Sequence, residues 1–170
     1  MDPLILTALF DDVLHDRLEA DRRAQFPAER NMIPAHLTLF HALPGDDIDG
    51  VTSAVALEAA AMAPPAARIA GLMKLGRGWA WQVEAPPLRA MHDRLRDAFA
   101  GRLTAQDDRR PKLHVTVQNK AAPAAVDAAG GRLRAAPPPP DGVVTALALW
   151  HYRGGPWERA ATFAFTGDAA

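Results

Sequence analysis

The sequence predicts an α+β fold of two lobes related by a pseudo-twofold axis, each an antiparallel-rich sheet with helices on the outside, around a central cleft. Two observations support this prediction. The expected elements run in the order strand, helix, strand, helix, strand, and the same order then repeats with one extra strand. In addition, Leu4 and His36 have counterparts about 75–78 positions later, in Trp79 and His114. A diverged duplication of this kind would bring equivalent positions face to face across the cleft.

The composition fits one globular domain. The chain has 170 residues, of which 49% are hydrophobic and 23% charged, so it can bury a core and is not expected to be disordered. Within this domain the repeat places the two lobes at about residues 1–76 and 77–170. Identity between the halves is weak outside one motif. One alternative therefore stays open, because alternating helices and strands are common in α+β proteins and equal offsets can arise by accident.

Five elements are expected in the first half. The first is a short apolar run typical of a buried strand, and the helix after it can be capped by Asp11 or Asp12. A second strand is expected after Pro34. A second helix runs from the turn at Pro44 to the break at Pro64, and a third strand follows. The expected ranges are 4–10, 11–25, 35–43, 48–62 and 67–75.

The second half repeats this order. A hairpin turn at 76–78, with glycines at both ends, leads into the next strand. Pro86 and Pro87 open a helix, because proline is tolerated in the first helical turn. A strand follows Pro111, and an alanine-rich helix precedes the stiff proline run at 137–140. The expected ranges, with two closing strands, are 79–84, 88–103, 112–118, 122–133, 143–152 and 160–165.

Charge and cysteine content exclude several classes of function. There are 19 Lys and Arg against 20 Asp and Glu, a formal net charge of −1, whereas a protein that coats nucleic acid non-specifically is clearly basic. The absence of cysteine excludes disulfides, thiol catalysis, iron–sulfur clusters and Cys-based zinc sites. No apolar run reaches roughly 18 residues, and the acidic start lacks the basic head of a secretory signal. We therefore expect a monomeric cytoplasmic protein with no membrane segment and no obligate protein partner.

One short motif occurs twice, at equivalent places in the two halves. It reads His-apolar-Thr-apolar and begins at His36 in the first half and at His114 in the second. Because alternate side chains of a strand share a face, His36 and Thr38 should point one way while their apolar neighbours enter the core. The same holds for His114 and Thr116. Composition alone predicts roughly 0.1 such motif in a chain like this one, so the doubled motif is the most specific signal in the sequence.

The residue types of this motif suit phosphodiester chemistry. A histidine titrates near pH ~6.5, so one neutral imidazole can take a proton while a protonated one gives a proton. Hydrolysis of a phosphodiester needs a base for the attacking water and an acid for the leaving oxygen. Each threonine hydroxyl could donate to a non-bridging phosphate oxygen, where charge builds in the transition state. The sequence therefore predicts His36 and His114 as catalytic residues and Thr38 and Thr116 as phosphate ligands, without a metal or other cofactor.

The other histidines are weaker candidates. His41 is five positions from His36, so on a regular strand it faces the opposite side, and we interpret it as structural. His15 and His92 lie on amphipathic helices and are expected in solvent, and His151 is expected on the surface near a strand end.

Other catalytic architectures lack their signatures. No HExxH-type spacing supports catalytic zinc, and the phosphate-binding Gly-x-x-x-x-Gly-Lys-Ser/Thr loop is absent. Ser53, the only serine, has no nucleophile elbow around it.

Candidate substrate contacts come from cations and one tryptophan near the motifs. Trp81 could stack on a base, although core packing is the better explanation for its position beside Trp79. For each cation the alternative is a solvated surface, which is the usual explanation for a charge near a strand end. The candidates are Lys74, Arg77, Lys112, Lys120, Trp81 and Arg153, with Arg109 and Arg110 also flanking the second motif.

The paired motifs, with their separation, the length of the chain and the order of elements, resemble the two-histidine phosphoesterase superfamily. This superfamily includes the bacterial 2′-5′ RNA ligases and the RNA cyclic phosphodiesterases. The resemblance implies two lobes around a cleft, each supplying one motif, and metal-free hydrolysis of 2′,3′-cyclic or related phosphodiesters. Carried over by position, it implies that His36 and His114 are the acid and the base and that Thr38 and Thr116 bind phosphate. Which histidine is the acid stays open.

The predicted function is hydrolysis of a cyclic nucleotide phosphate or of an RNA end, so the expected partner is a nucleotide or RNA terminus. Two alternatives from other classes stay open. The cleft could bind an RNA end or nucleotide without catalysis, or both imidazoles could be buried core residues. Joining of 2′-5′ ends is the same reaction run backwards in the same site.

Overall fold

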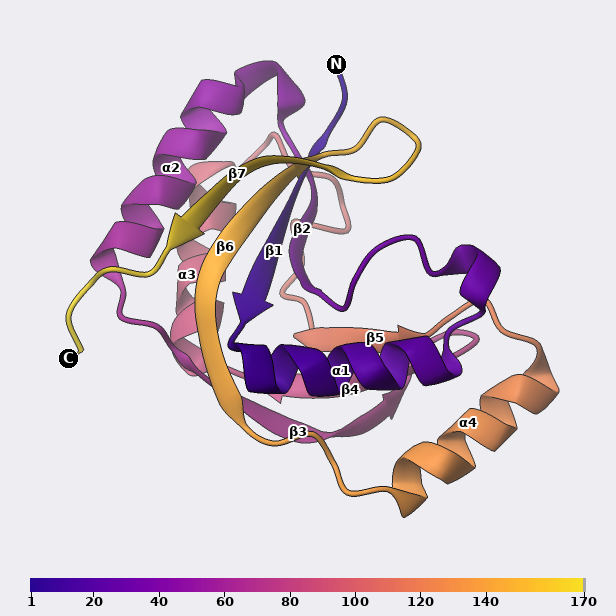
Figure 1. The fold of residues 1–170 in the computed structure, drawn as a ribbon. Coiled ribbons are helices and arrows are strands. Elements are labelled where there is room, and N and C mark those ends of the chain that lie inside the picture. Colours follow the sequence, from indigo (N-terminus) through magenta and orange to yellow (C-terminus); the bar gives the residue numbers. More distant parts are fainter. Residues whose placement is uncertain (170) are drawn as a thin grey trace.

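The computed structural model describes residues 1–169 and has the predicted α+β fold (Figure 1). Four α-helices accompany seven strands, which all pair antiparallel, and two short 3₁₀ turns, Ala28–Arg30 and Gly45–Asp47, were not expected from the sequence. The elements are β1 (Leu4–Phe10), α1 (Asp12–Gln25), β2 (Leu37–Leu43), α2 (Ile48–Ala61), β3 (Ala66–Lys74), β4 (Trp79–Glu84), α3 (Pro86–Ala98), β5 (His114–Gln118), α4 (Pro123–Ala135), β6 (Gly142–His151) and β7 (Glu158–Ala164).

The strands form a closed circuit. The sheet order is β1-β2-β5-β4-β3-β6-β7, and β1 also pairs with β6, so that six strands return to their starting point while β7 lines the outer edge of β6. Two connections within this circuit are short. β3 and β6 share only the register pairs Ala66–Val143 and Ala67–Gly142, and β2 and β5 share only Leu37–Val115. One group of strands is therefore β2, β1, β6 and β7, and the other is β5, β4 and β3.

Strand pairing crosses the middle of the sequence. β3 from the first half pairs with β4 from the second, and β1 pairs with β6. The division into two lobes at about residues 1–76 and 77–170 stays a prediction, and hydrogen bonds join strands across this boundary.

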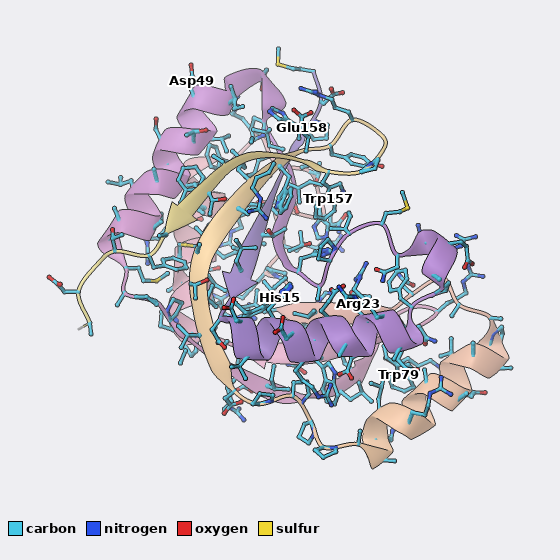
Figure 2. The ribbon with its side chains drawn as sticks, viewed as in Figure 1. His15, Arg23, Asp49, Trp79, Trp157 and Glu158 are labelled. Carbon is cyan, nitrogen blue, oxygen red and sulfur yellow. The ribbon has the colours of Figure 1, made fainter. Side chains whose placement is uncertain are left out.

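Helices cover each strand group. α1 contacts β5 and α4 contacts β4, whereas α2 lies against β6 and β7 with α3 beside it (Figure 1). α1 begins as predicted, because the Asp11 carboxylate accepts a hydrogen bond from the Leu14 amide at 3.1 Å. α4 is held by Trp79, labelled in Figure 2, whose indole N–H donates to the Val126 carbonyl at 2.8 Å. These contacts enclose a core of mainly aliphatic side chains.

α3 is shorter than the sequence indicated. The predicted helix ran to residue 103, but α3 ends at Ala98, and Gly101 follows with a left-handed φ of 79°. The chain from there to β5 is a loop without regular strand or α-helix, and this loop reaches the site described below. No helix among residues 1–169 is long and apolar enough to cross a bilayer.

Candidate active site

The two motifs meet where β2 and β5 touch. Leu37 and Val115 are register partners in an antiparallel pair, and both are fully buried. If this register is continued by one residue in each direction, His36 stands opposite Thr116 and Thr38 opposite His114. The two histidines then occupy a diagonal, for which side-chain origins about 7–8 Å apart are expected. A local twofold axis through Leu37 and Val115 thus relates the two pairs.

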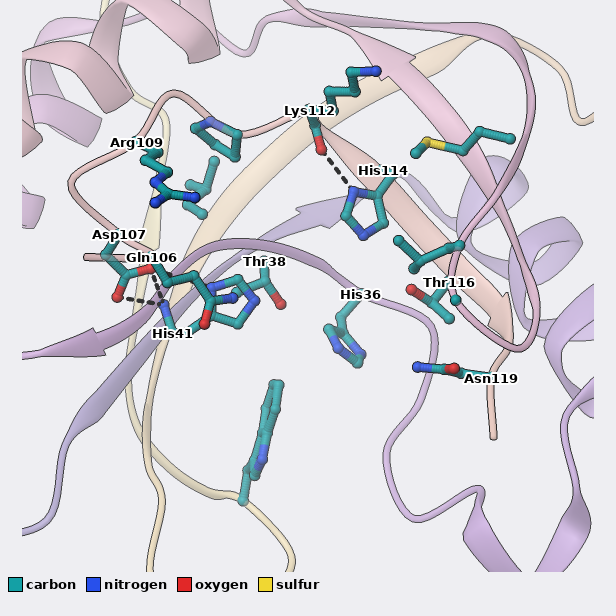
Figure 3. Close-up of a pocket in the computed structure, with 16 residues that line it drawn as sticks. His36, Thr38, His41, Gln106, Asp107, Arg109, Lys112, His114, Thr116 and Asn119 are labelled. Atoms are coloured by element: carbon teal, nitrogen blue, oxygen red, sulfur yellow. Dashed lines mark hydrogen bonds and ion pairs between the residues drawn. The ribbon is translucent and has the colours of Figure 1, made fainter. Parts of the chain in front are cut away.

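All four motif side chains line one cavity of about 690 Å³ (Figure 3). This confirms the prediction that the histidine and threonine of each motif share a face. Their apolar neighbours enter the core, since Leu37, Leu39, Val115 and Val117 are at most 1% exposed. The second alternative from the sequence, in which both imidazoles are core residues, is wrong because both rings face this open cavity.

Both catalytic candidates have the same ring support. Nδ1 of His36 lies 2.7 Å from the Pro34 carbonyl oxygen, and Nδ1 of His114 lies 2.6 Å from the Lys112 carbonyl oxygen. A carbonyl oxygen only accepts, so each Nδ1 carries a proton and donates it. Nε2 is therefore the nitrogen that is free to exchange a proton in both rings. In both motifs the carbonyl that accepts this hydrogen bond belongs to the residue two positions before the histidine, so the repeated motif has a repeated contact.

The surroundings of His36 disfavour its charged form. Burial lowers the pKa of His36 to about 4, and the charges of Arg22, His41 and His114 act in the same direction, against the hydrogen bond to Pro34. His36 is therefore neutral at pH 7, as a general base must be before it takes a proton.

Arg22, which the sequence analysis did not single out, ties α1 to the site. Its side chain is buried, Nη1 donates to the Thr116 carbonyl at 2.8 Å, and Nε donates to Asn31 Oδ1 at 2.7 Å. The guanidinium also lies over the Phe26 ring. The signal that could have identified it is its spacing, because Arg22 follows the buried Leu14 and Leu18 at intervals of four and so lies on the buried face of α1.

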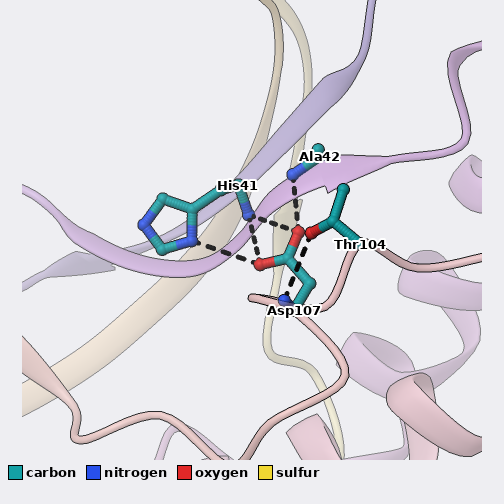
Figure 4. A network of polar contacts seen from close by, with 4 residues as sticks. All are labelled: His41, Ala42, Thr104 and Asp107. Carbon is teal, nitrogen blue, oxygen red and sulfur yellow. Dashed lines mark hydrogen bonds and ion pairs between the residues drawn. The ribbon is translucent and has the colours of Figure 1, made fainter.

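The prediction that His41 faces away from the site is wrong. The pairing of β1 with β2 contains register shifts, and Leu39 and Phe40 are both buried where regular alternation would expose one of them. This irregularity reverses the alternation, so His41 returns to the face of His36 and lines the cavity. Its Nδ1 lies 3.2 Å from Oδ1 of Asp107, a residue of the loop after α3 (Figure 4).

The candidate substrate contacts are dispersed. Lys112 lines the main cavity, and so does Arg109. Lys74 and Arg77 line a separate cavity of about 170 Å³, which shares Gly76 with the first. Lys120 lines neither of these two cavities.

Two candidates have other partners. Trp81 is 4% exposed and its indole N–H donates to Asp21 at 2.8 Å, so the ring belongs to the core and the suggested stacking role for it is not supported. Arg153 pairs with Glu158 and Asp2 and does not line the cavity.

Trp157 is the aromatic residue that lines the cavity. It lies at the end of the turn between β6 and β7, where Figure 2 labels it. Its ring packs edge-on against His36 with centroids 4.8 Å apart, and Trp150 lies 6.1 Å away. Sequence patterning missed Trp157 because it belongs to no expected strand or helix.

His92 also differs from its prediction. It was expected in solvent on α3, but it is 1% exposed and stacks on Phe40 of β2 with ring centroids 4.4 Å apart. Burial lowers its pKa and so disfavours the charged form of the ring. Within residues 1–169 no group of three or more His, Asp or Glu side chains is arranged to hold a metal ion.

Comparison with known proteins relates this chain to one family. The family model described as the 2′-5′ RNA ligase superfamily matches residues 10–156. The crystal structure of TT0787 from Thermus thermophilus has a TM-score of 0.65 at 20% identity, covering 98% of this chain and 100% of that one. The crystal structure of E. coli LigT complexed with NADP+ has a TM-score of 0.60 at 14% identity, covering 97% of this chain and 98% of that one. A crystal structure described as a phosphoesterase has a TM-score of 0.60 at 19% identity, covering 98% of this chain and 99% of that one. These likenesses show the fold, and no curated protein sequence matches the chain significantly.

Proposed function

Because the chain belongs to the 2′-5′ RNA ligase superfamily, we propose that it is a phosphodiesterase that hydrolyses 2′,3′-cyclic phosphates or related phosphodiesters of nucleotides or RNA ends by two-histidine acid–base catalysis. The observation that carries the proposal is the Leu37–Val115 pair, which brings two His/Thr pairs into one cavity with both Nε2 atoms free.

The proposed reaction is an in-line attack of water on phosphorus. One Nε2 takes a proton from water as the water oxygen bonds to phosphorus. The bond from phosphorus to O2′ or O3′ then breaks, and the other Nε2–H gives its proton to the departing oxygen. The imidazolium that forms on the base and the imidazolium that starts as the acid both keep their Nδ1–H on a backbone carbonyl. The hydroxyls of Thr38 and Thr116 donate to the non-bridging oxygens as their charge increases.

The pKa of His36 supports assigning it the base role, which leaves the acid role to His114. A leaving-group comparison tests this assignment. An alkoxide needs an acid to leave, whereas p-nitrophenolate does not. Loss of the acid should therefore slow cleavage of a 2′,3′-cyclic phosphate far more than cleavage of bis(p-nitrophenyl) phosphate. A His114→Ala variant that slows both substrates equally contradicts the assignment.

A nucleotide is the proposed substrate. Trp157 offers a base a stacking surface beside His36, and the cavity volume lies in the range of small-molecule sites. LigT, which shares the fold, has been solved with 3′-AMP and with NADP+. We also propose that the protein acts as a cytoplasmic monomer. Joining of 2′-5′ ends would use the same groups in reverse.

The test is turnover of 2′,3′-cyclic mononucleotides in EDTA by wild type, His114→Ala and the control His15→Ala. His15 lies on α1 and does not line the cavity. We expect wild-type turnover without metal, a loss of roughly 10²-fold or more in His114→Ala, and no change in the control. Nucleotide binding without turnover would instead indicate a non-catalytic binding module.

A further inference from the structure

A third imidazole shares the face of the two catalytic candidates. His41 lines the cavity at the end of the site beyond Thr38, and its side chain is 49% exposed (Figure 3). It stands five positions after His36, and the residue five positions after His114 is Asn119, which also lines the cavity. The local twofold axis thus relates His41 at one end of the site to a neutral amide at the other.

The His41 ring rests on a buried carboxylate. Asp107 is 3% exposed and accepts hydrogen bonds from the His41 amide at 2.9 Å and the Ala42 amide at 2.7 Å, in addition to the one from Nδ1 of the His41 ring (Figure 4). Burial opposes the ionisation of Asp107, but these hydrogen bonds together hold the pKa of its carboxyl below its usual value. The carboxylate only accepts, so Nδ1 of His41 carries a proton. When the ring is protonated, Nε2–H on the other side of the ring from Asp107 can donate to an anionic ligand.

The same end of the cavity carries an arginine without an acidic partner. Arg109 follows Asp107 in the loop and lines the cavity near His41 (Figure 3). It makes no ion pair within residues 1–169, whereas Arg110 beside it pairs with Asp93. The opposite end of this cavity presents the amide of Asn119, and the other cationic residue that lines it, Lys112, lies beside His114 (Figure 3). Arg109 and a protonated His41 can therefore attract an anionic group together at this end of the cavity.

The hydrogen-bond donors of the two motifs discriminate poorly by themselves between the two orientations of a substrate. Two His/Thr pairs related by a twofold axis offer nearly the same donors to a scissile phosphate whichever way round the substrate lies. We propose that His41, positioned by Asp107, is a specificity-determining residue that binds a second phosphate of the substrate together with Arg109, and thereby decides which way the substrate lies. This inference rests on the proposed function, and its substrate class is a nucleotide cyclic phosphate with a further phosphate on the 5′ side.

Orientation has a chemical consequence. With His36 and His114 fixed, turning the substrate around exchanges the positions of O2′ and O3′ relative to the acid. The water oxygen bonds to phosphorus in either case, but the P–O2′ bond breaks in one orientation and the P–O3′ bond in the other. The isomer of the product phosphomonoester therefore reports the orientation.

The experiment compares adenosine 2′,3′-cyclic phosphate with and without a 5′-phosphate, using wild type, His41→Ala and the control His15→Ala. In His41→Ala the carboxylate of Asp107 keeps its two backbone donors, so the fold of β2 is preserved. We expect wild type to prefer the 5′-phosphorylated substrate. His41→Ala should lose about 10–100-fold in kcat/KM on that substrate, the range for a hydrogen bond to a charged group. The loss of kcat/KM in His41→Ala on the 5′-hydroxyl substrate should be under about threefold. On the 5′-phosphorylated substrate, His41→Ala should release a mixture of product isomers.

Equal losses on both substrates with an unchanged isomer ratio would overturn the inference. Binding separates this failure from failure of the proposed function. If no cyclic phosphate is turned over, the affinities of 3′-AMP and adenosine 3′,5′-bisphosphate still report on the subsite. Wild type should bind the bisphosphate about tenfold more tightly, and His41→Ala should lose that preference. Equal affinities in wild type, or a preference that survives in His41→Ala, contradict the subsite.

Discussion

Replacement of Arg22 by methionine tests whether a buried guanidinium from α1 maintains the site. Methionine keeps much of the aliphatic volume but removes the donors to the Thr116 carbonyl and to Asn31 and the charge that lies near His36. Each lost hydrogen bond inside the protein costs about 1–3 kcal/mol, and relief of the buried charge offsets part of this. We expect a net loss of about 1–3 kcal/mol.

Two measurements follow from this change. For a domain of this size each kcal/mol lowers the melting temperature by about 2–4 °C, which thermal denaturation resolves. Removal of the Arg22 charge also raises the pKa of His36 from its depressed value, so the acid limb of the kcat/KM profile should move to higher pH. The shift in the acid limb distinguishes an effect on the site from a general loss of stability.

The matched control is Arg23→Met. Arg23 is the next residue of α1, is exposed, and forms an i,i+4 pair with Glu19 at 3.1 Å. Such pairs contribute little, so its effect on stability should stay within about 0.5 kcal/mol and the pH profile should not move. The reasoning about Arg22 is refuted if Arg22→Met matches this control in both melting temperature and acid limb.

Three further predictions concern pH, stacking and packing. The pKa of His36 is lower in the folded protein than its ordinary value of 6.5, so the free energy of unfolding should fall by at most about 3 kcal/mol as the pH drops from about 6.5 to about 4. His36→Gln should remove this part of the acid sensitivity, which urea titrations at several pH values can measure. Trp157→Ala should raise KM for nucleoside cyclic phosphates about 5-fold or more but leave glycerol 1,2-cyclic phosphate, which has no base, unaffected. Gly130→Ala should destabilise, because its Cβ would lie 2.6 Å from the Trp79 ring, whereas Gly131→Ala, with open space around it, should stabilise by about 0.5–1 kcal/mol in thermal melts.

Local patterns predicted the residues at the centre of the site. His36 and Thr38 share a face, and so do His114 and Thr116, because the two-residue repeat of a strand depends only on backbone geometry. The start of α1 at Asp11 was equally predictable, since an N-cap acts over three residues.

Residues around this centre required long-range information. The face of the sheet on which the His41 side chain lies depends on register shifts, and these exist only in the pairing of β1 with β2. Asp107 and Trp157 come from loops whose paths are determined by packing, and periodicity carries no information about such paths. His92 was expected in solvent because its side chain is polar, and its stacking on Phe40 depends on how α3 packs against β2.

The sequence by itself determined the α+β class, most of its elements and the two His/Thr pairs. Only the tertiary structure decided that these pairs meet at Leu37 and Val115, that His36 is held neutral, and that a third histidine with a buried carboxylate stands beside them. The physical reason is one of range. Side-chain direction within a strand follows from adjacent dihedral angles, whereas strand neighbours, burial and loop paths result from the packing of the whole chain.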